Sequence, residues 1–397
     1  MRLPCPQLFD FANSGPSLAI HRRLSRPWSR LAALLVVELM ALASMACHKQ
    51  PPPPRAYVAF VVNNQSQSVV AVNLAGPQIV ATIPVAPLPE KAIRRPAHRE
   101  VYVVSKSGKI TVIEFPGLTV AGTFDIGKQA GDLVFSPDGD RAYALEPQEG
   151  KIVFLNCNSL KETGQVSLVP KLAHMAITPD GKTLIASDPG SDRLFFVSTD
   201  TQKVLGTVKV GKTPGPLAVL HDSSVVFVAD TGEEKISAAE ISSRTILAHI
   251  EMGSRPDRLV LKPDGGELFV FSNEGTSMTI VDAFHDNIEQ VLPTGRDPVA
   301  AAFSRDSSMM YLATEADGFV SAFDIANRSV QSTVHVGVSP VALALTPDER
   351  FLAVADSASG SLALVRTSPL SLITVVPVGS NPVDVIVPGW ELVQNGR

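Results

Sequence analysis

From residue 56 onward, apolar residues come in short runs separated by turn residues. The runs are four to seven residues long, as in residues 225–229, and Gly, Pro, Asp and Asn stand between them. Runs of this length and setting predict β-strands rather than helices. The Pro-Asp-Gly triplets at 137–139, 179–181 and 263–265 predict tight hairpin turns. In such turns Pro fixes φ at the first position and Gly supplies a positive φ at the end.

The runs repeat with a nearly constant period. One strand of each unit supplies an anchor residue, and the anchors are Tyr57, Tyr102, Tyr143, Ile185, Phe227, Phe269, Tyr311 and Ala353. The steps between successive anchors are 45, 41 and then five times 42 residues. A period of about 40–45 residues with four strands per unit indicates the blades of a β-propeller.

Each unit also carries a Val-Gly-like step shortly before a Pro, as in Val210-Gly211 before Pro214. With the Ser-Pro-Asp-Gly turns and Tyr102-Val103-Val104-Ser105, these units resemble the YVTN-type β-propeller repeat proteins of bacterial and archaeal envelopes. The resemblance covers roughly residues 56–390. It implies an all-β fold of four-stranded antiparallel blades.

The eight anchors predict eight blades, with seven blades and an accessory unit as the alternative. The chain begins on the second strand of a blade and ends on a lone apolar strand at 382–387. We expect that last strand to pair with the first three and close the ring, since closure hides sheet edges. The propeller is therefore predicted over 56–390, followed by a tail at 391–397.

The N-terminal residues predict an export signal over 1–46. Residues 1–30 carry five Arg and one acid, an apolar run broken by Glu38 follows at 31–46, and Cys47 comes next. The run is short for a membrane span, which needs about 20 residues. Ser44-Met45-Ala46-Cys47 resembles a bacterial lipobox, which implies lipidation at Cys47. Plain signal cleavage or a membrane-tethered N-terminus stays the alternative. Residues 47–55 then form a Cys anchor and a Pro-rich linker.

Composition narrows the function classes. Hydrophobic residues make up 45% and charged residues 18%, which excludes a disordered chain. The net charge is −5, and removal of residues 1–46 leaves 29 basic and 37 acidic residues, a net charge of −8. Nucleic-acid binding relies on basic surfaces and is therefore not expected. Three Cys make no disulfide framework, and Cys157 is predicted to be a small buried residue.

Candidate binding residues gather where the blades should meet a central channel. One column lies in the strand after each Pro, five residues before the turn: Lys91, Asp132, His174, Pro216, Arg258, Ala300, Ala342 and Asp384. A second basic set lies on the crossings between blades: Lys128, Lys171, Lys212, Arg255 and Arg296. Charges on an innermost strand are costly unless they are solvated, paired or bound to a ligand. A water-filled channel with ion pairs and an anion-binding channel mouth both remain open.

Motifs for chemistry are absent from the sequence. No nucleophile elbow, Cys-x-x-Cys, metal-binding His pair or phosphate loop is found. We therefore predict no catalytic residue, no metal and no cofactor, and enzyme activity stays uncertain. An eight-bladed propeller also resembles the haem d1 domain of nitrite reductases, which implies an axial His, and His174 is the candidate within the column. Lactonase propellers share the fold class, but no catalytic set carries over.

The leading interpretation is an exported, lipid-anchored, monomeric propeller that acts as a binding scaffold at the cell envelope. Its partner would be an envelope protein or glycan, and its location periplasmic or at the cell surface. The alternative is a small-anion-binding or enzymatic propeller, lactonase-like or haem d1-like. In that case Lys91, His174 and Arg258 should face a shared funnel. In a scaffold they should instead be locked into pairs with Asp132 and Asp384.

Overall fold

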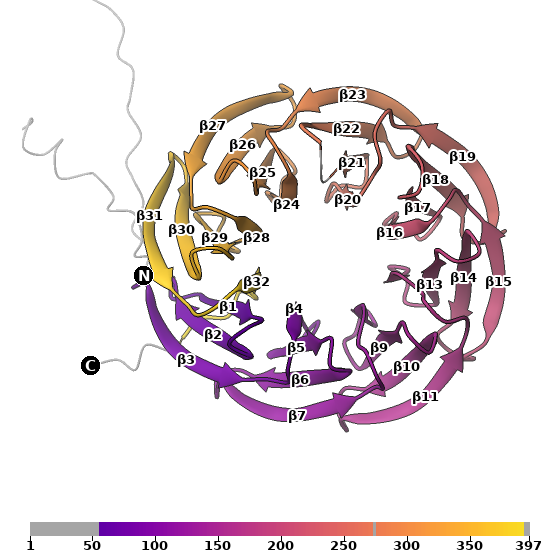
Figure 1. The fold of residues 1–397 in the computed structure, drawn as a ribbon, viewed down its shortest axis with the longest axis horizontal. Helices are drawn as coiled ribbons and strands as arrows, with labels where there is room; N and C mark the ends of the chain where they lie inside the picture. The colour runs from indigo at the N-terminus through magenta and orange to yellow at the C-terminus, as the bar shows by residue number, and fades with distance from the viewer. Residues whose placement is uncertain (1–54, 273–274, 393–397) are drawn as a thin grey trace, which may run out of the picture. The chain divides into compact units, whose positions relative to one another are not determined.

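In the described part of the chain, the repeated apolar runs form 32 β-strands, which make eight antiparallel four-stranded sheets arranged around a common axis (Figure 1). The computed structural model describes residues 55–272 and 275–392. The predictions for the signal, for Cys47 and for most of the linker fall outside these residues. The prediction of an eight-bladed propeller is confirmed.

Each sheet has one strand at each of four radial positions. The innermost strands are β32 (Pro382–Ile386), β4 (Pro89–Arg94), β8 (Leu133–Phe135), β12 (Met175–Ile177), β16 (Pro214–Val219), β20 (Arg258–Leu261), β24 (Pro298–Phe303) and β28 (Pro340–Leu345). The second strands are β1 (Val58–Asn63), β5 (Glu100–Ser105), β9 (Arg141–Glu146), β13 (Thr183–Asp188), β17 (Val225–Asp230), β21 (Glu267–Phe271), β25 (Met309–Thr314) and β29 (Phe351–Asp356). The third strands are β2 (Ser68–Asn73), β6 (Lys109–Glu114), β10 (Lys151–Asn156), β14 (Arg193–Ser198), β18 (Lys235–Glu240), β22 (Ser277–Asp282), β26 (Phe319–Asp324) and β30 (Ser361–Thr367). The outermost strands are β3 (Gln78–Pro84), β7 (Thr119–Asp125), β11 (Lys161–Ser167), β15 (Val204–Lys209), β19 (Thr245–Glu251), β23 (Asn287–Pro293), β27 (Ser329–His335) and β31 (Leu370–Pro377).

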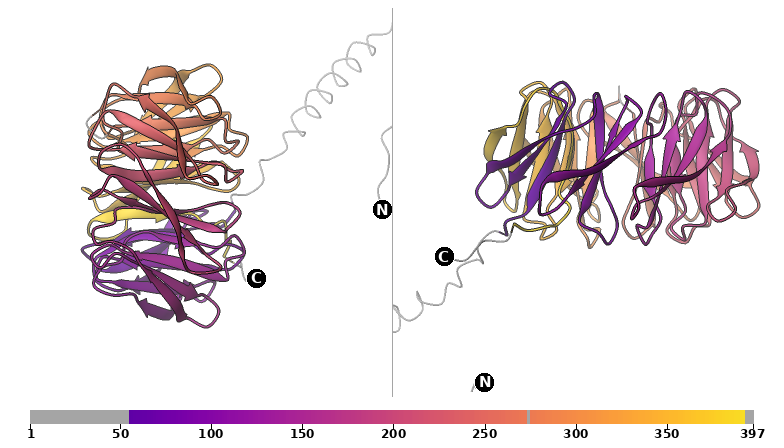
Figure 2. Two further views of the ribbon diagram at one scale, coloured as in Figure 1. Left: turned by 90° about the vertical axis from the view of Figure 1, so that its right-hand side faces the viewer. Right: turned by 90° about the horizontal axis from the view of Figure 1, so that it is seen from below.

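The ring closes through the pairing that the sequence predicts. Strand β32 pairs with β1, and together with β2 and β3 they form blade 1. Blades 2 to 8 each take four consecutive strands, starting at β4. Figure 2 shows the yellow end of the chain against its indigo beginning. Beyond β32, Glu391 makes a β-bridge with Tyr57, and the Arg55 guanidinium lies 3.3 Å from the Glu391 carboxylate.

The structure corrects one anchor of the predicted repeat. In blade 2, Val104 of β5 pairs with Lys91 of the innermost strand. The equivalent pairing in blade 1 joins Val62 to Asp384, so Phe60 and not Tyr57 corresponds to Tyr102. The anomalous first step of 45 residues thus becomes 42. Tyr57 looks like an anchor because it is a buried aromatic residue, but its backbone bridges the C-terminal segment instead.

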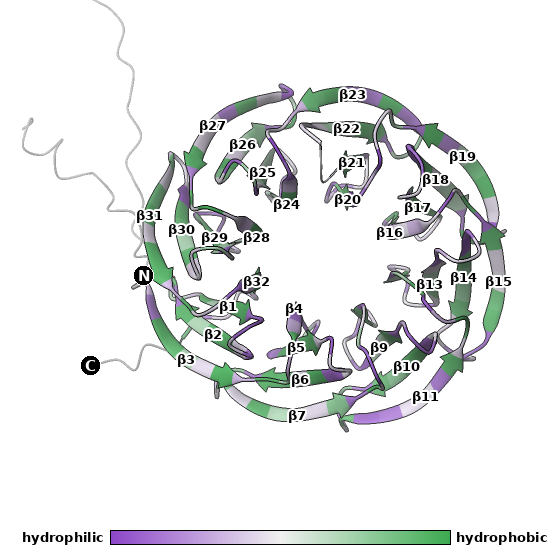
Figure 3. Cartoon of the chain, viewed as in Figure 1, coloured by the Kyte–Doolittle hydropathy of each residue, from purple (hydrophilic) through white to green (hydrophobic). Residues whose placement is uncertain are grey.

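The hydrophobic core lies between the blades. Among the described residues there are eight clusters of buried side chains, one at each interface between neighbouring blades. The cluster between blades 1 and 2 contains Phe60, Phe115 and Trp390, and Trp390 stacks edge-on against Phe60. Figure 3 shows that the middle strands of the blades are mostly hydrophobic, whereas hydrophobic and polar positions alternate along the outermost strands. Cys157 is buried and makes no disulfide, as predicted.

Strand pairing defines two faces of the propeller. The start of an innermost strand lies beside the end of the second strand, and the start of the third strand lies beside the end of the outermost one, as in Lys109 against Asp125. The crossings between blades and the turns between second and third strands therefore share one face, here called the crossing face. The Pro-Asp-Gly turns lie on the other, here called the turn face.

Candidate functional site

Two cavities that share lining residues are formed by the innermost strands of the ring. The first has a volume of about 730 Å³ and the second about 430 Å³. Both are lined by Lys91, Asp132, His174 and Arg258, together with Leu259. The ionisable column residues thus form a belt where the two cavities meet. Pockets of several hundred Å³ with a few convergent polar groups are typical of small-molecule sites.

Asp132 and His174 form one pair within this belt. His174 Nδ1 lies 3.1 Å from Asp132 Oδ2, and the same oxygen accepts a 2.9 Å hydrogen bond from the Met175 amide. Both residues come one position before their strands, β8 and β12. Burial alone would raise the pKa of Asp132. The contact with His174, the Met175 amide and the nearby charge of Lys91 outweigh it, so that pKa is lowered.

Asp384 makes the same kind of contact at the interface of blades 1 and 2, two interfaces away from the contact of Asp132. Its Oδ2 accepts a 2.8 Å hydrogen bond from the Ala92 amide of β4, and its Oδ1 accepts one from Val385 at 2.9 Å. Burial raises the pKa of Asp384, and these two amides and the charge of Lys91 only partly oppose that rise. Each aspartate therefore fastens the innermost strand of the next blade to its own blade through its Oδ2.

Lys91 and Arg258 differ from the other charged members of the belt. Lys91 is exposed in the channel and makes no ion pair within 4.0 Å in the described part of the chain. Arg258 is half-buried, and its Nε is closed off from solvent without a hydrogen-bond partner among the described residues. Burial lowers the pKa of Arg258, which the charge of Asp257 partly opposes. An unsatisfied buried donor costs about 1–3 kcal/mol, so this guanidinium can gain energy from a ligand.

One sector of the channel wall is small and apolar. Blades 7 and 8 line the first cavity with the runs 299–301 and 341–343, which contain only Val, Ala and Leu. This sector has no charge, whereas blades 1 to 4 carry Asp384, Lys91, Asp132 and His174 in succession and blade 6 carries Arg258. The channel wall therefore combines one apolar sector with a larger sector that bears charged and polar side chains.

The crossing residues lie apart from this site. None of Lys128, Lys171, Lys212, Arg255 and Arg296 lines either cavity. All five are exposed on the crossing face. Lys128 lies 3.1 Å from Glu149, and Arg296 Nε lies 2.7 Å from Asp317. The structure therefore brings together the column residues and leaves the crossing residues on the rim.

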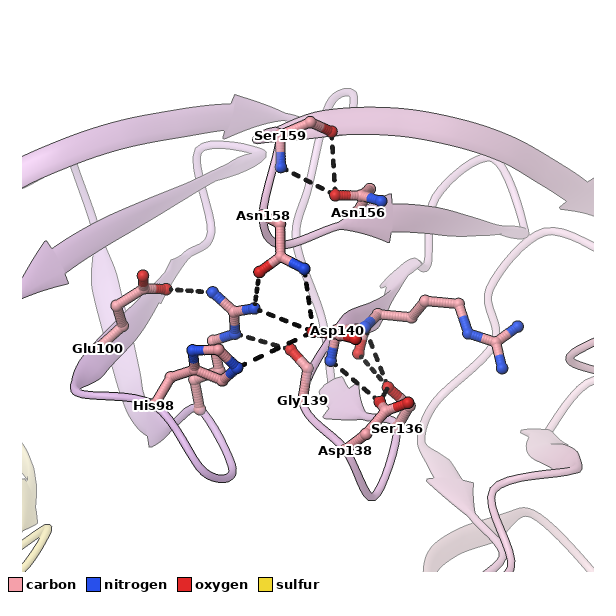
Figure 4. A network of polar contacts seen from close by, with 11 residues as sticks. His98, Glu100, Ser136, Asp138, Gly139, Asp140, Asn156, Asn158 and Ser159 are labelled. Carbon is pink, nitrogen blue, oxygen red and sulfur yellow. Dashed lines mark hydrogen bonds and ion pairs between the residues drawn. The ribbon is translucent and has the colours of Figure 1, made fainter.

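A buried arginine at the seam of blades 2 and 3 was not singled out from the sequence (Figure 4). Arg95 Nε donates to the Gly139 carbonyl at 2.7 Å, Nη1 to Glu100 at 3.0 Å, and Nη2 to Asn158 Oδ1. Asn158 in turn donates to Asp140 at 2.9 Å. Arg95 is only 1% exposed. It is a structural clamp on the turn face, away from the channel cavities.

The repeat itself carried a signal for Arg95. The equivalent turn position holds Ser136, Thr178, Ser304 and Thr346 in other blades, and each hydroxyl donates to the Asp two residues later. Lys262 stands at this position in blade 6 and its ammonium also lies 3.1 Å from the Asp two residues later, Asp264. Blade 2 has Ala97 in place of that Asp, so Arg95 has no such partner in its own turn and reaches the neighbouring blade instead.

Comparison with protein families matches residues 263–388 to the Cytochrome D1 heme domain. The match covers fewer than half of the residues, running from the turn after β20 through β32. It includes the apolar wall residues of blades 7 and 8 and Asp384, but not Lys91, Asp132, His174 or Arg258.

Solved structures share the fold at low identity. The dihydro-heme d1 dehydrogenase NirN in complex with DHE aligns with a TM-score of 0.74 and 15% identity, over 86% of this chain and 78% of that one. AztD of Citrobacter koseri aligns with 0.68 and 13%, over 84% and 98%. A functionally unknown protein from Desulfotomaculum acetoxidans aligns with 0.57 and 16%, over 71% and 98%. These likenesses establish a β-propeller.

Other comparisons and searches add little. No curated protein matches the chain. Residues 55–272 and 275–392 hold no group of three His, Cys, Asp or Glu side chains that could bind a metal ion. The same residues include no helix with the length and apolar character of a membrane span.

Proposed function

We propose that the propeller binds a small anionic ligand in its central channel. The observation that carries this proposal is Arg258, a half-buried guanidinium whose Nε has no partner within the described residues and which lines both cavities. The nearby charge of Asp257 offsets only part of the cost of burying this cation. A carboxylate or phosphate oxygen would repay it, because the guanidinium fork matches those groups.

The neighbouring charges support an anion rather than a cation. Asp132 and Asp384 already accept hydrogen bonds from the next blade, so their negative charge is partly neutralised. Glu90 also lines the first cavity, but it pairs with Lys106. Lys91 remains exposed and adds a second cation to the belt. The apolar sector of the wall would suit an organic anion with an apolar side.

A carboxylated tetrapyrrole of the haem d1 type is a second candidate, favoured by the partial family match and by His174. His174 Nδ1 contacts Asp132, which leaves Nε2 for a ligand. Metal-binding imidazoles usually have a carboxylate or carbonyl on the other ring nitrogen. His174 would therefore hold the metal through Nε2, Lys91 and Arg258 would pair with the carboxylates, and the bound group would supply redox chemistry. A haem absorbance titration tests this, and equal spectra for wild type and His174→Ala would count against it.

The cellular setting remains the one predicted from the N-terminal residues. We infer an exported protein of the YVTN-type group, held at the envelope by a lipid on Cys47. A scaffold role with an envelope protein or glycan is compatible with a channel ligand, because such a partner would meet the crossing face. Labelled palmitate should enter the wild-type protein and not Cys47→Ala. Equal labelling of both would remove the lipid anchor.

The anion proposal is tested by calorimetry on the purified full chain with carboxylates, phosphates and sugar acids. A ligand at 100 times its dissociation constant should add about 2.7 kcal/mol of stability. Arg258→Gln should weaken binding about tenfold to hundredfold, since hydrogen bonds to charged groups contribute about 1.5–3 kcal/mol. Arg255→Gln is the matched control, because Arg255 is exposed and lines neither cavity. Equal losses in both variants, or no binding at all, would overturn the proposal.

A further inference from the structure

The two cations of the belt stand at equivalent positions in their blades. Lys91 pairs with Val104, and Arg258 pairs with Phe271. Val104 and Phe271 each lie two residues after their anchors, Tyr102 and Phe269. The two charged side chains therefore start at the same height along the channel axis.

The blade order places these cations on opposite walls. Lys91 belongs to blade 2 and Arg258 to blade 6, which are four blades apart in a ring of eight whichever way the ring is followed. Figure 1 shows β4 and β20 facing each other across the centre. In each of the other three pairs of opposite column residues, at most one member carries a charge. These pairs are Asp132 and Ala300, His174 and Ala342, and Pro216 and Asp384.

The second cavity connects the two cations. Its volume is about 430 Å³, and its lining runs from Lys91 in blade 2 through blades 3, 4 and 5 to Arg258 in blade 6. Asp132, His174 and Leu217 lie between these ends. A small anion bound to one wall would leave the other cation unused, whereas an elongated ligand could reach both.

We propose that the channel ligand is a dianion whose two acid groups stand at opposite ends, one held by Lys91 and the other by Arg258. This inference rests on the proposed anion-binding function and deepens it. The middle of the ligand should be uncharged, because the carboxylates of Asp132 and Asp257 line the cavity between or beside the cations and would repel a third acid group. His174 offers that middle section one hydrogen-bonding nitrogen.

The test is calorimetry with unbranched α,ω-dicarboxylates of increasing length and the monocarboxylate of each length. We expect one length to bind best and to exceed its monocarboxylate at least tenfold. An α,ω-bisphosphonate series run in parallel decides which acid group is preferred. Lys91→Gln and Arg258→Gln should each abolish the preference for two acid groups, and Lys91→Arg should retain it.

The outcomes separate this inference from the proposed function. If mono- and dicarboxylates bind equally and Arg258→Gln weakens both, the channel binds anions but the two-ended ligand is overturned. If affinity does not depend on length, or if Lys91→Gln leaves the dianion preference intact, the inference is likewise overturned. If no anion binds the wild type, both proposals fail together. Circular dichroism of each variant confirms that the binding change occurs in a folded propeller.

Discussion

Two arginines near the inner strands have opposite surroundings. Arg95, at the seam of blades 2 and 3, donates to Gly139, Glu100 and Asn158 and is almost fully buried. Arg258, in the channel, keeps a buried Nε without a partner in the described protein and lines two cavities. The difference shows that burial of a charge does not mark a binding site. A missing partner beside an open volume is the more informative sign.

The largest effect is expected for Arg95, the arginine of this pair whose guanidinium has several hydrogen-bond partners. Arg95→Met should cost about 3–5 kcal/mol of unfolding free energy, because it leaves Glu100, Asp140 and Asn158 without their shared partner. Urea denaturation measures this. The matched control is Arg94→Met, since Arg94 is exposed and its guanidinium only lies over the Trp390 ring at 5.8 Å. That change should cost about 1 kcal/mol. Equal costs for the two variants would refute the clamp.

A buried carboxylate sharpens the comparison, because one of its oxygens lacks a partner and it lines neither channel cavity. Asp230 Oδ2 accepts a 2.7 Å hydrogen bond from Ser237, which also contacts His249, while Oδ1 is buried without a partner among the described residues. Burial, aided by the charges of Glu233 and Asp192, raises the pKa of Asp230 to about 7. The folded state therefore holds this proton more tightly than the unfolded chain, and stability falls as pH rises from about 4 to 7.

Asp230→Asn should remove the loss of stability that occurs between about pH 4 and 7. We expect a gain of about 1–3 kcal/mol at pH 8 and little gain near pH 4, measured by urea denaturation at both values. Anion affinity should not change, because Asp230 lines neither channel cavity. Asp188→Asn is the control at the equivalent strand end, where the carboxylate accepts bonds from Gly190 and Ser191, and it should destabilise the fold. A gain at pH 4 as large as that at pH 8 would contradict the assignment.

The smallest expected effect is at the rim. Lys128→Gln removes an exposed ion pair with Glu149 and should leave the denaturation midpoint unchanged. Anion affinity should change by less than about twofold, because charges at the exposed rim are screened by salt. Calorimetry at low and physiological salt checks this. A loss comparable to that of Arg258→Gln would move the binding site from the channel to the crossing face.

The fold was largely predictable because the repeat constrains it. A period near 42 residues and the Pro-Asp-Gly turns predicted both the number of strands and the closure. The misplaced anchor, Tyr57, lies in the first blade, where the preceding inner strand is supplied from residues 382–386 and gave no local reference. Sequence periodicity fails where a unit is assembled from two distant parts of the chain.

The candidate site was predictable only in part. The column position placed Lys91, Asp132, His174 and Arg258 at a common height, and the structure lines both cavities with them. Which of these charges find partners depends on side-chain reach across blade interfaces, as for Asp132 and the Met175 amide. A one-dimensional pattern does not contain that distance. The same limit applies to Arg95, because Gly139 and Asn158, which accept two of its hydrogen bonds, belong to the next blade.

The pairing of β32 with β1 also sets an order of events during synthesis. Phe60 and Val62 find their partners Ile386 and Asp384 only after more than 300 further residues have been made. Blades 2 to 8 each consist of consecutive strands, so they can form as the chain grows, but blade 1 waits for its innermost strand. Such a long-range contact is slow to form. A nascent chain therefore remains an open arc of blades until its last strand is available to pair with β1.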